Sequence, residues 1–340
     1  MRVAVIGAGA VGGTIAALLD RAGHDVEVTA RGAHLDAIRS SGLRLTGEWG
    51  DHTARIDANL MLTKAPELAI VTTKALDAAT ALRDNADWVR GVPVVVIQNG
   101  IKSISTARDV LPHTDIVGGL ALFAASYVAP GHVAVTTTGS TYLGNAENGL
   151  DVDYAASVLT AVMPVRITHN FAGAQWTKLV VNQINALPTI TGTNAQATIA
   201  DRRLRLVLTR SMQEAVTVAL GAGIHFEKLQ GLSDKLLRLF RRLPLPLAQA
   251  LPLVMRWRMG PTPNPGSTLQ SIRRGQKTEI DFLNGAIVDA ATVSGTSAPI
   301  NAVLVDMVHE VEITGVFLSE EEIVERVNGV GRGGPPAPAV

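Results

Sequence analysis

The chain contains no cysteine, and this absence removes several kinds of chemistry at once. None of its 340 residues can form a disulfide, act as a thiolate nucleophile or complete a zinc–thiolate site. An excess of either charge is also missing, because the formal net charge at pH 7 is +0. A neutral chain is not built to bind nucleic acid through its phosphates, so we expect no nucleic-acid partner.

Long apolar runs are missing too. No uninterrupted run reaches the ~18 residues that a membrane-spanning helix needs. The opening MRVAVIGAGAVGG looks superficially like a signal sequence, but it has glycines throughout and no cleavage-type sequence follows it. We therefore expect a folded first segment, a cytoplasmic location and no stable membrane insertion.

What the sequence does contain is a regular alternation of short apolar runs and helical patterns. Apolar residues make up 47% of the chain, which is enough for two sizeable cores. Alternation of this kind predicts a parallel, doubly wound sheet, and residues 116–145 add further β-branched, glycine-punctuated strands to the same domain. The strands are expected at residues 3–7, 25–30, 68–73 and 92–98, with a helix over 10–23.

The second half of the chain has helical patterns only. Long amphipathic stretches are expected to form helices over 202–223, 266–295 and 298–315. The predicted fold class is therefore α/β, an N-terminal Rossmann-type doubly wound sheet followed by an all-helical C-terminal domain. The domains are placed at 1–168, at 169–330 and, as a disordered tail, at 331–340.

One apolar segment between the helices is rich in arginine and broken by three prolines. Residues 235–259 read either as a membrane-surface or partner-binding segment or, more plainly, as a pair of short helices broken at Pro244 and Pro246. In the plainer interpretation these helices cover the helical domain or a dimer seam, and the sequence leaves room for a homodimer.

A glycine pattern joins the first strand to the first helix. Gly7-Ala8-Gly9-Ala10-Val11-Gly12 provides glycines for a tight turn, for close approach of a pyrophosphate and for helix–strand packing. The helix N-terminus then meets the phosphate charge. This context predicts a dinucleotide site.

The residue after the second strand distinguishes NADP from NAD. NAD sites usually place an acid there, whereas this chain has Arg31, and Glu27 lies earlier within the strand. An arginine suits a 2′-phosphate, so NADP (NADPH) is the expected cofactor, unless Arg31 is an ordinary solvated loop residue. Lys74, after the third strand, points the same way more weakly.

The stretch WTKLVVNQIN places an ammonium and two amides on an otherwise apolar helix. Lys178, Asn182 and Asn185 follow at intervals of four and three, which puts them on one helical face. Burying that face without partners would cost about 1–3 kcal/mol for each amide. The face is therefore either solvated or receives a polar ligand.

Seven motifs, in order along nearly the whole chain, resemble the ketopantoate reductase (2-dehydropantoate 2-reductase) family. This resemblance implies NADPH-dependent reduction of 2-dehydropantoate to pantoate, a step of pantothenate and coenzyme A biosynthesis. The motifs are GAGAVG (7–12), ARGAHLDAIRSSGLRL (30–45), TTKA (72–75), QNG (98–100), PGHV (130–133), WTKLVVN (176–182) and TEIDFLNG (278–285).

The resemblance also implies catalytic roles. Reduction of a ketone needs a proton donor at the developing alkoxide. Lys178 matches the family's general acid, and burial would lower its pKa from ~10.4 toward the working range. Glu279 matches the acid that contacts the substrate hydroxyl and the lysine region, and Asn99 an asparagine that positions the reacting groups near the nicotinamide.

Substrate contacts follow from the same resemblance. Asn182 matches a substrate-binding asparagine, and Ser267 falls where the family has a serine donor for the substrate carboxylate, with Asn264 beside it. A serine at a helix start is also a routine N-cap. Asn185 is assigned to the substrate as the second asparagine of the motif.

The chain departs from the family pattern around the substrate pocket. The second asparagine usually follows the first by four residues, whereas Asn185 follows Asn182 by three, and a proline comes only at Pro188. Either the helix is irregular there or Asn185 does not reach the substrate. Ser271 stands where an acid is common, and the 229–263 segment is longer than usual. These departures weaken the substrate assignment more than the reaction.

Other functions stay open at this point. The histidines show no ligand-like clustering, so no metal site is expected. A reductase of a different 2-oxo acid or ketone on the same scaffold is the first alternative, a non-catalytic NADP-binding sensor the second, and a membrane-associated protein acting through its arginines the third.

Overall fold

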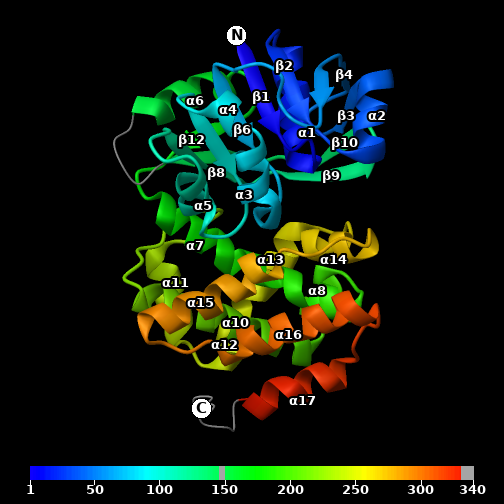
Figure 1. Cartoon of the computed structure of the whole chain (residues 1–340). Coiled ribbons are helices and arrows are strands. Elements are labelled where there is room, and N and C mark those ends of the chain that lie inside the picture. The colour runs from blue at the N-terminus through cyan, green and yellow to red at the C-terminus, as the bar shows by residue number, and fades with distance from the viewer. Residues whose placement is uncertain (145–149, 331–340) are drawn as a thin grey trace, which may run out of the picture. The chain divides into compact units, whose positions relative to one another are not determined.

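A computed structural model describes residues 1–144 and 150–330 of the chain (Figure 1). Contacts divide it into two compact units, Met1–Ala174 and Gln175–Val340. The first is an α/β unit and the second is helical, so the predicted fold class is confirmed. The tail predicted at 331–340 lies outside the described residues, and the assignment of cofactor and substrate to separate domains stays a prediction.

The first unit is built on an eight-stranded sheet. Its central strands are parallel, because β1 pairs in parallel with β2 and β6, and β6, β7 and β8 continue in the same way. At one edge β11 runs antiparallel to β8. The order is β12 (Val165–Ile167), β11 (Thr141–Gly144), β8 (Ile116–Ala121), β7 (Val94–Ile97), β6 (Leu68–Val71), β1 (Arg2–Ile6), β2 (Asp25–Thr29) and β5 (Asp57–Asn59).

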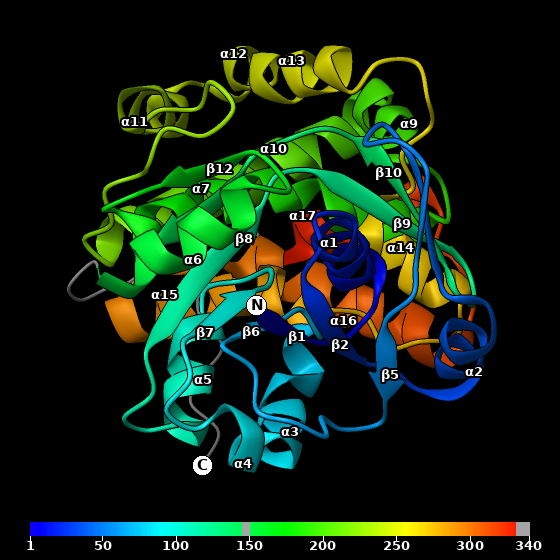
Figure 2. The ribbon, with the colours of Figure 1, turned by 90° about the horizontal axis from the view of Figure 1, so that it is seen from above.

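Both faces of this sheet are buried, which explains why its strands are nearly continuous apolar runs. On β1, Val3 and Val5 belong to the core that includes α1 (Ala10–Arg21), whereas Ala4 and Ile6 belong to the core on the other face. Figure 2 shows α1 and α6 (Leu150–Thr160) on one side of the sheet. The other side carries α3 (Ala75–Asp84), α4 (Ala86–Val89) and α5 (Ser103–Val110).

A second, four-stranded sheet takes part of the segment that was expected to add strands to the first domain. The strands predicted within 116–145 divide between the two sheets, since β8 and β11 join the large sheet while β9 and β10 form a hairpin in the small one. The small sheet recruits β3 by parallel pairing with β10. Its order is β4 (His52–Ala54), β3 (Leu43–Gly47), β10 (His132–Thr137) and β9 (Ala124–Ala129). The helix α2 (Gly32–Ser41) precedes it.

The helical unit contains two of the predicted long helices and breaks the third. The helix α10 (Arg202–Gly221) and the helix α16 (Pro299–Thr314) agree with the predictions for 202–223 and 298–315. The single helix expected over 266–295 is wrong. It is divided into α14 (Gly266–Arg273), the 3₁₀ turn η2 (Ile280–Phe282) and α15 (Asn284–Ser294).

The remaining helices are short. The arginine-rich segment forms three of them instead of the expected pair, and Leu237, Phe240, Ala248 and Pro252 are its buried residues. Among the described residues, no helix has the length and apolar character needed to cross a membrane. The short helices are α7 (Phe171–Asn182), η1 (Gln183–Asn185), α8 (Ala186–Thr191), α9 (Ala195–Ala200), α11 (Asp234–Arg242), α12 (Leu245–Ala248), α13 (Ala250–Met259) and α17 (Glu320–Val330).

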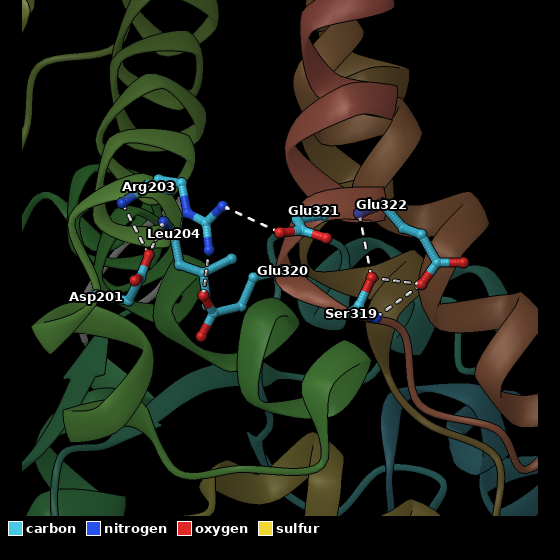
Figure 3. A network of polar contacts seen from close by, with 7 residues as sticks. All are labelled: Asp201, Arg203, Leu204, Ser319, Glu320, Glu321 and Glu322. Atoms are coloured by element: carbon cyan, nitrogen blue, oxygen red, sulfur yellow. Dashed lines mark hydrogen bonds and ion pairs between the residues drawn. The ribbon is translucent and has the colours of Figure 1, made fainter.

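Polar contacts at two helix N-termini join α10 to α17 (Figure 3). The Asp201 carboxylate caps α10 by accepting from the backbone N–H groups of Arg203 and Leu204, at 2.8 Å each. Arg203 Nη2 then donates to Glu320 Oε2 at 2.8 Å. Ser319 and Glu322 form a capping box at the start of α17, which fixes where this last helix begins.

Candidate active site

The glycine-rich turn between β1 and α1 is held by two threonines, Thr29 at the end of β2 and Thr72 directly after β6. The backbone N–H of Gly7 donates to Thr29 Oγ1, and the N–H of Ala8 to Thr29 O, both at 2.9 Å. Thr72 Oγ1 donates to the Gly7 carbonyl at 2.7 Å. These contacts fix a turn in which Gly7 has φ +101°, a conformation that favours glycine.

The three glycines of the pattern have different surroundings. A Cβ at Gly7 would lie 2.8 Å from the Thr73 backbone nitrogen, and one at Gly12 would lie 2.1 Å from both the Gly7 carbonyl and Thr72 Oγ1. A Cβ at Gly9 would meet nothing within 4 Å. Gly9 is the N-cap residue of α1, whose first turn carries no acid. Open space before a helix N-terminus suits a phosphate group.

The other residues predicted to bind the cofactor lie at the same edge of the sheet. Arg31, Lys74 and Asn99 each follow the carboxyl end of a parallel strand, namely β2, β6 and β7. The chain reverses its order between β1 and β6, and ligands of open α/β sheets bind at such a switch point. Arg31 is exposed, and Lys74 and Asn99 are half-buried. The first unit therefore brings its predicted residues to one edge.

Glu27, the acidic residue of the second strand, binds groups of the protein interior. Glu27 is buried, and its Oε1 accepts from Asn59 Nδ2, from the Thr63 backbone N–H and from Thr63 Oγ1, at 2.9 Å each. A carboxylate held in this way is structural. Arg31, exposed at the N-cap of α2, is left as the charged side chain directly after β2.

His34 joins the glycine-rich turn to the β9–β10 hairpin. The Gly131 backbone N–H donates to His34 Nδ1 at 2.9 Å, so the proton of a neutral ring lies on Nε2, which donates to the Ala8 carbonyl at 2.7 Å. Burial lowers the pKa of His34, which favours this neutral form. Its ring lies 4.9 Å from that of Tyr127.

In the helical unit, Lys178 and Glu279 lie close enough to interact. Lys178 is on α7 and half-buried, and desolvation lowers its pKa to about 8, whereas the nearby Glu279 carboxylate acts in the opposite direction. Glu279 immediately precedes η2. A lysine whose pKa lies near physiological pH can give up and regain its proton there, as a general acid requires.

The helix that carries Lys178 changes character after Asn182. The chain continues as the 3₁₀ turn η1 and then as α8, which contains Pro188. The irregularity predicted as one alternative is therefore present. Asn185 is buried, and its Nδ2 donates to the Asn182 carbonyl at 3.1 Å. Asn182 is half-buried.

The predicted substrate residues of α14 lie next to this irregular turn, because α14 packs against η1 and α8. Asn264 Oδ1 accepts from the Gly266 backbone N–H at 2.9 Å and shapes the start of the helix. A Cβ at Gly266 would lie 2.5 Å from Asn185 Oδ1. Ser267 is exposed and is not the N-cap, since Pro265 has that position. The routine capping role is thus not the function of Ser267.

Several side chains that hold the glycine turn were not predicted as site residues, although Thr72 and His34 lie within motifs of the family resemblance. Thr29, Thr72 and His34 support the glycine turn, but each comes from another part of the chain. The position of Thr29 and Thr72 directly at strand ends was an available hint. Among the described residues, no group of three or more histidines and acids could hold a metal ion.

Two family models match this chain. Ketopantoate reductase PanE/ApbA matches residues 3–148, and Ketopantoate reductase PanE/ApbA C terminal matches residues 170–312. The 2-dehydropantoate 2-reductase of Pyrococcus horikoshii is 28% identical over 324 residues, which cover 93% of this chain and 99% of that protein. That of Archaeoglobus fulgidus is 28% identical over 92% of this chain and 98% of its own length.

Solved structures share the fold. A PanE/ApbA family ketopantoate reductase from Ralstonia eutropha JMP134 superposes with a TM-score of 0.79 at 28% identity, over 92% of this chain and 99% of that one. D-mandelate dehydrogenase with NADH and anilino(oxo)acetate superposes with a TM-score of 0.78 over the same shares, at 22% identity. The second likeness is one of fold alone.

Proposed function

The chain belongs to the ketopantoate reductase PanE/ApbA family of oxidoreductases, and we propose that it reduces 2-dehydropantoate to pantoate with NADPH. The observation that carries the proposal is the half-buried Lys178, whose pKa is lowered to about 8, beside Glu279. Pantoate formation would place the enzyme in pantothenate and coenzyme A synthesis, a cytoplasmic role for a protein that acts on a small molecule.

The cofactor site is supported by the edge of the sheet in the first unit. We assign the backbone N–H groups at the start of α1 to the pyrophosphate, since Gly9 has open space before it. Arg31 is assigned to the 2′-phosphate that distinguishes NADPH from NADH, and Lys74 to the same charge. Asn99, after β7, is assigned to the nicotinamide end.

The chemical roles of the protein's own residues follow from charge. NADPH, when bound, supplies the hydride that reduces the 2-oxo carbon. Lys178 donates a proton from Nζ to the ketone oxygen as that oxygen gains the carbonyl electron pair, and is left as a neutral amine. Glu279 keeps the amine protonated in the resting site by raising its pKa. Asn182, Asn185, Asn264 and Ser267 are assigned to the substrate's hydroxyl and carboxylate.

A different 2-oxo acid is the second candidate substrate. The 3₁₀ turn at Gln183–Asn185 and the buried Ser271, whose Oγ donates to the Ser267 carbonyl at 3.2 Å, both lie beside the proposed substrate residues. The fold also serves D-mandelate dehydrogenase, whose structure contains NADH and anilino(oxo)acetate. This candidate is favoured if a larger or more apolar keto acid outcompetes 2-dehydropantoate.

The test is NADPH oxidation by the purified protein with 2-dehydropantoate and a panel of aliphatic and aromatic 2-oxo acids. We expect 2-dehydropantoate to give the highest kcat/KM, and Lys178→Ala to lower it by about 10²–10⁴-fold. Arg31→Ala should raise the KM for NADPH and leave that for NADH nearly unchanged. A higher kcat/KM for another acid supports the second candidate, and cofactor binding without any turnover would make the protein a sensor.

A further inference from the structure

Five polar side chains meet in the interior of the helical unit. They come from η1, α10, α15 and α16, and four of them are fully buried, with exposed fractions of 0%. Buried amides and hydroxyls are costly unless their hydrogen bonds are made, so the hydrogen bonds within such a group hold its members together. The residues are Gln183, Ser211, Glu214, Asn284 and Asn301.

Gln183 is the centre of this network. Its Oε1 accepts from Asn284 Nδ2 at 2.8 Å and lies 2.7 Å from Ser211 Oγ, a second donor. Its Nε2 donates to the Leu179 carbonyl at 3.1 Å, which holds the amide against its own helix. The amide therefore joins the start of η1, directly after α7, to the first residue of α15, across 101 residues of sequence.

Asn301 and Glu214 complete the other side. Asn301 Oδ1 accepts from Asn284 Nδ2 at 3.0 Å, so both hydrogens of the Asn284 amide are used, whereas its buried Oδ1 has no hydrogen-bond partner among the described residues. Asn301 Nδ2 donates to Glu214 Oε2 at 2.8 Å. The Glu214 carboxylate also accepts the backbone N–H groups of Ile300 and Asn301, at 3.0 Å each, at the start of α16. The mid-helix Glu214 is thus structural.

The positions of Gln183 and Asn284 relate this contact to the proposed chemistry. Gln183 follows Lys178 by five residues, and Asn284 follows Glu279 by five. Residues 178–182 are the last turn of α7, whereas Glu279 is joined to Asn284 by the 3₁₀ turn η2 and by Leu283, whose φ of −107° and ψ of −92° are not helical. Both connections are only five residues long, so a contact between their far ends restricts where the backbones of Lys178 and Glu279 lie relative to each other.

We propose that the buried Gln183–Asn284 hydrogen bond is a positioning contact that sets the separation of Lys178 from Glu279. This inference rests on the proposed function, in which these two side chains act together at the substrate oxygen. Gln183 and Asn284 act through Lys178 and Glu279 and do not touch the reacting atoms. Displacement of a reacting group by ~1 Å can cost about 10²-fold in rate, so the contact matters for turnover.

If Gln183 and Asn284 had only a packing role, their replacement would affect stability and not turnover. Replacing both partners of a buried hydrogen bond by apolar groups of similar shape is often neutral for stability, whereas replacing one leaves an orphan that costs about 1–3 kcal/mol. In a Gln183→Met/Asn284→Leu variant, Ser211 Oγ keeps Asn301 Oδ1, 3.1 Å away, as its acceptor. The double variant should therefore fold. Any loss of its activity then reports on the positions of Lys178 and Glu279 and not on loss of stability.

Steady-state kinetics of Gln183→Met, Asn284→Leu and the double variant test the proposal. We expect each variant to lose about tenfold or more in kcat with an unchanged KM for NADPH, and the double variant to lose no more than the worse single one, because the contact is shared. The control is Thr209→Val, which removes a buried hydrogen bond internal to α10. It should lower the Tm and leave kcat within about twofold. Wild-type kcat in the double variant would overturn the proposal.

A second readout does not require turnover. The chain's reaction with an amine-reactive reagent, followed at Lys178 by peptide mass spectrometry, should show a midpoint near pH 8 in the wild type. In the double variant that midpoint should move by about half a pH unit or more, because Lys178 no longer keeps its distance from Glu279. An unchanged midpoint refutes the positioning contact. Absence of 2-oxo acid reduction by the wild type would instead refute the proposed function, and the midpoint would still test the contact.

Discussion

A lysine whose charge is partly removed from water needs a compensating partner or a use. Lys178 has a partner, since the Glu279 carboxylate raises a pKa that desolvation lowers more strongly, with the result near 8. Glu214 is the contrasting case. Burial raises the pKa of Glu214, but three N–H donors bind its oxygens, and the carboxylate holds the start of α16 and has no chemical role.

The lowered pKa of Lys178 predicts opposite pH dependences for the two reaction directions. Reduction needs the protonated amine, so kcat/KM should fall as the pH rises through about 8. Oxidation of the 2-hydroxy acid needs the neutral amine as a base and should rise over the same interval. Initial rates from pH 6 to 10 in both directions check this. In Lys178→Ala both profiles should lose this step, and a step that persists would assign it to another group.

At the scale of an element, the β1–α1 turn needs glycine for two different reasons. Gly12 has no room for a side chain, because its neighbours are a carbonyl and a threonine hydroxyl that themselves hold the turn. Gly9 has room, and its φ of −66° is accessible to any residue. Gly12 is thus needed for the fold, whereas Gly9 leaves space for a ligand at the N-terminus of α1.

This difference predicts distinct outcomes for two single-methyl substitutions. Gly12→Ala should destabilise the protein by about 1–3 kcal/mol through overpacking, with cofactor binding lost as the turn shifts. Gly9→Ala should keep the wild-type Tm and weaken NADPH binding by about tenfold or more, because its methyl enters the space before α1. Thermal unfolding and a fluorescence titration with NADPH measure both effects. Equal losses of stability would contradict the separate roles.

The division of the whole molecule into two units predicts where cofactor stabilisation appears. NADPH at about 100 times its Kd stabilises the structure that binds it by about 2.7 kcal/mol. Hydrogen exchange should therefore slow in peptides of β1, β2, β6 and β7, and change little in α15 and α16. Arg31→Ala should reduce the effect of NADPH while that of NADH is retained. Equal slowing throughout the chain would show that the two units open together.

Local pattern was enough for most elements of the fold. We could predict the apolar runs of β1, β2, β6 and β7 and the amphipathic stretches of α10 and α16. Their hydrophobic patterns depend only on residues that are close together in the sequence. The interruption between α14 and α15 was not predicted. It lies where Gly275 has φ +62° and where the Thr278 backbone N–H donates to Glu312 Oε1 at 2.7 Å. This acceptor belongs to another helix, so local sequence does not reveal it.

By itself, the sequence determined the fold class, the glycine turn and the spacing of Lys178 from its asparagines, because each depends on neighbours along the chain. Tertiary structure alone decided that β3 pairs with β10, that Thr72 holds the Gly7 carbonyl and that Gln183 meets Asn284. Such contacts join residues that are distant in sequence, and a hydrogen bond between them exists only once burial has removed the competing water.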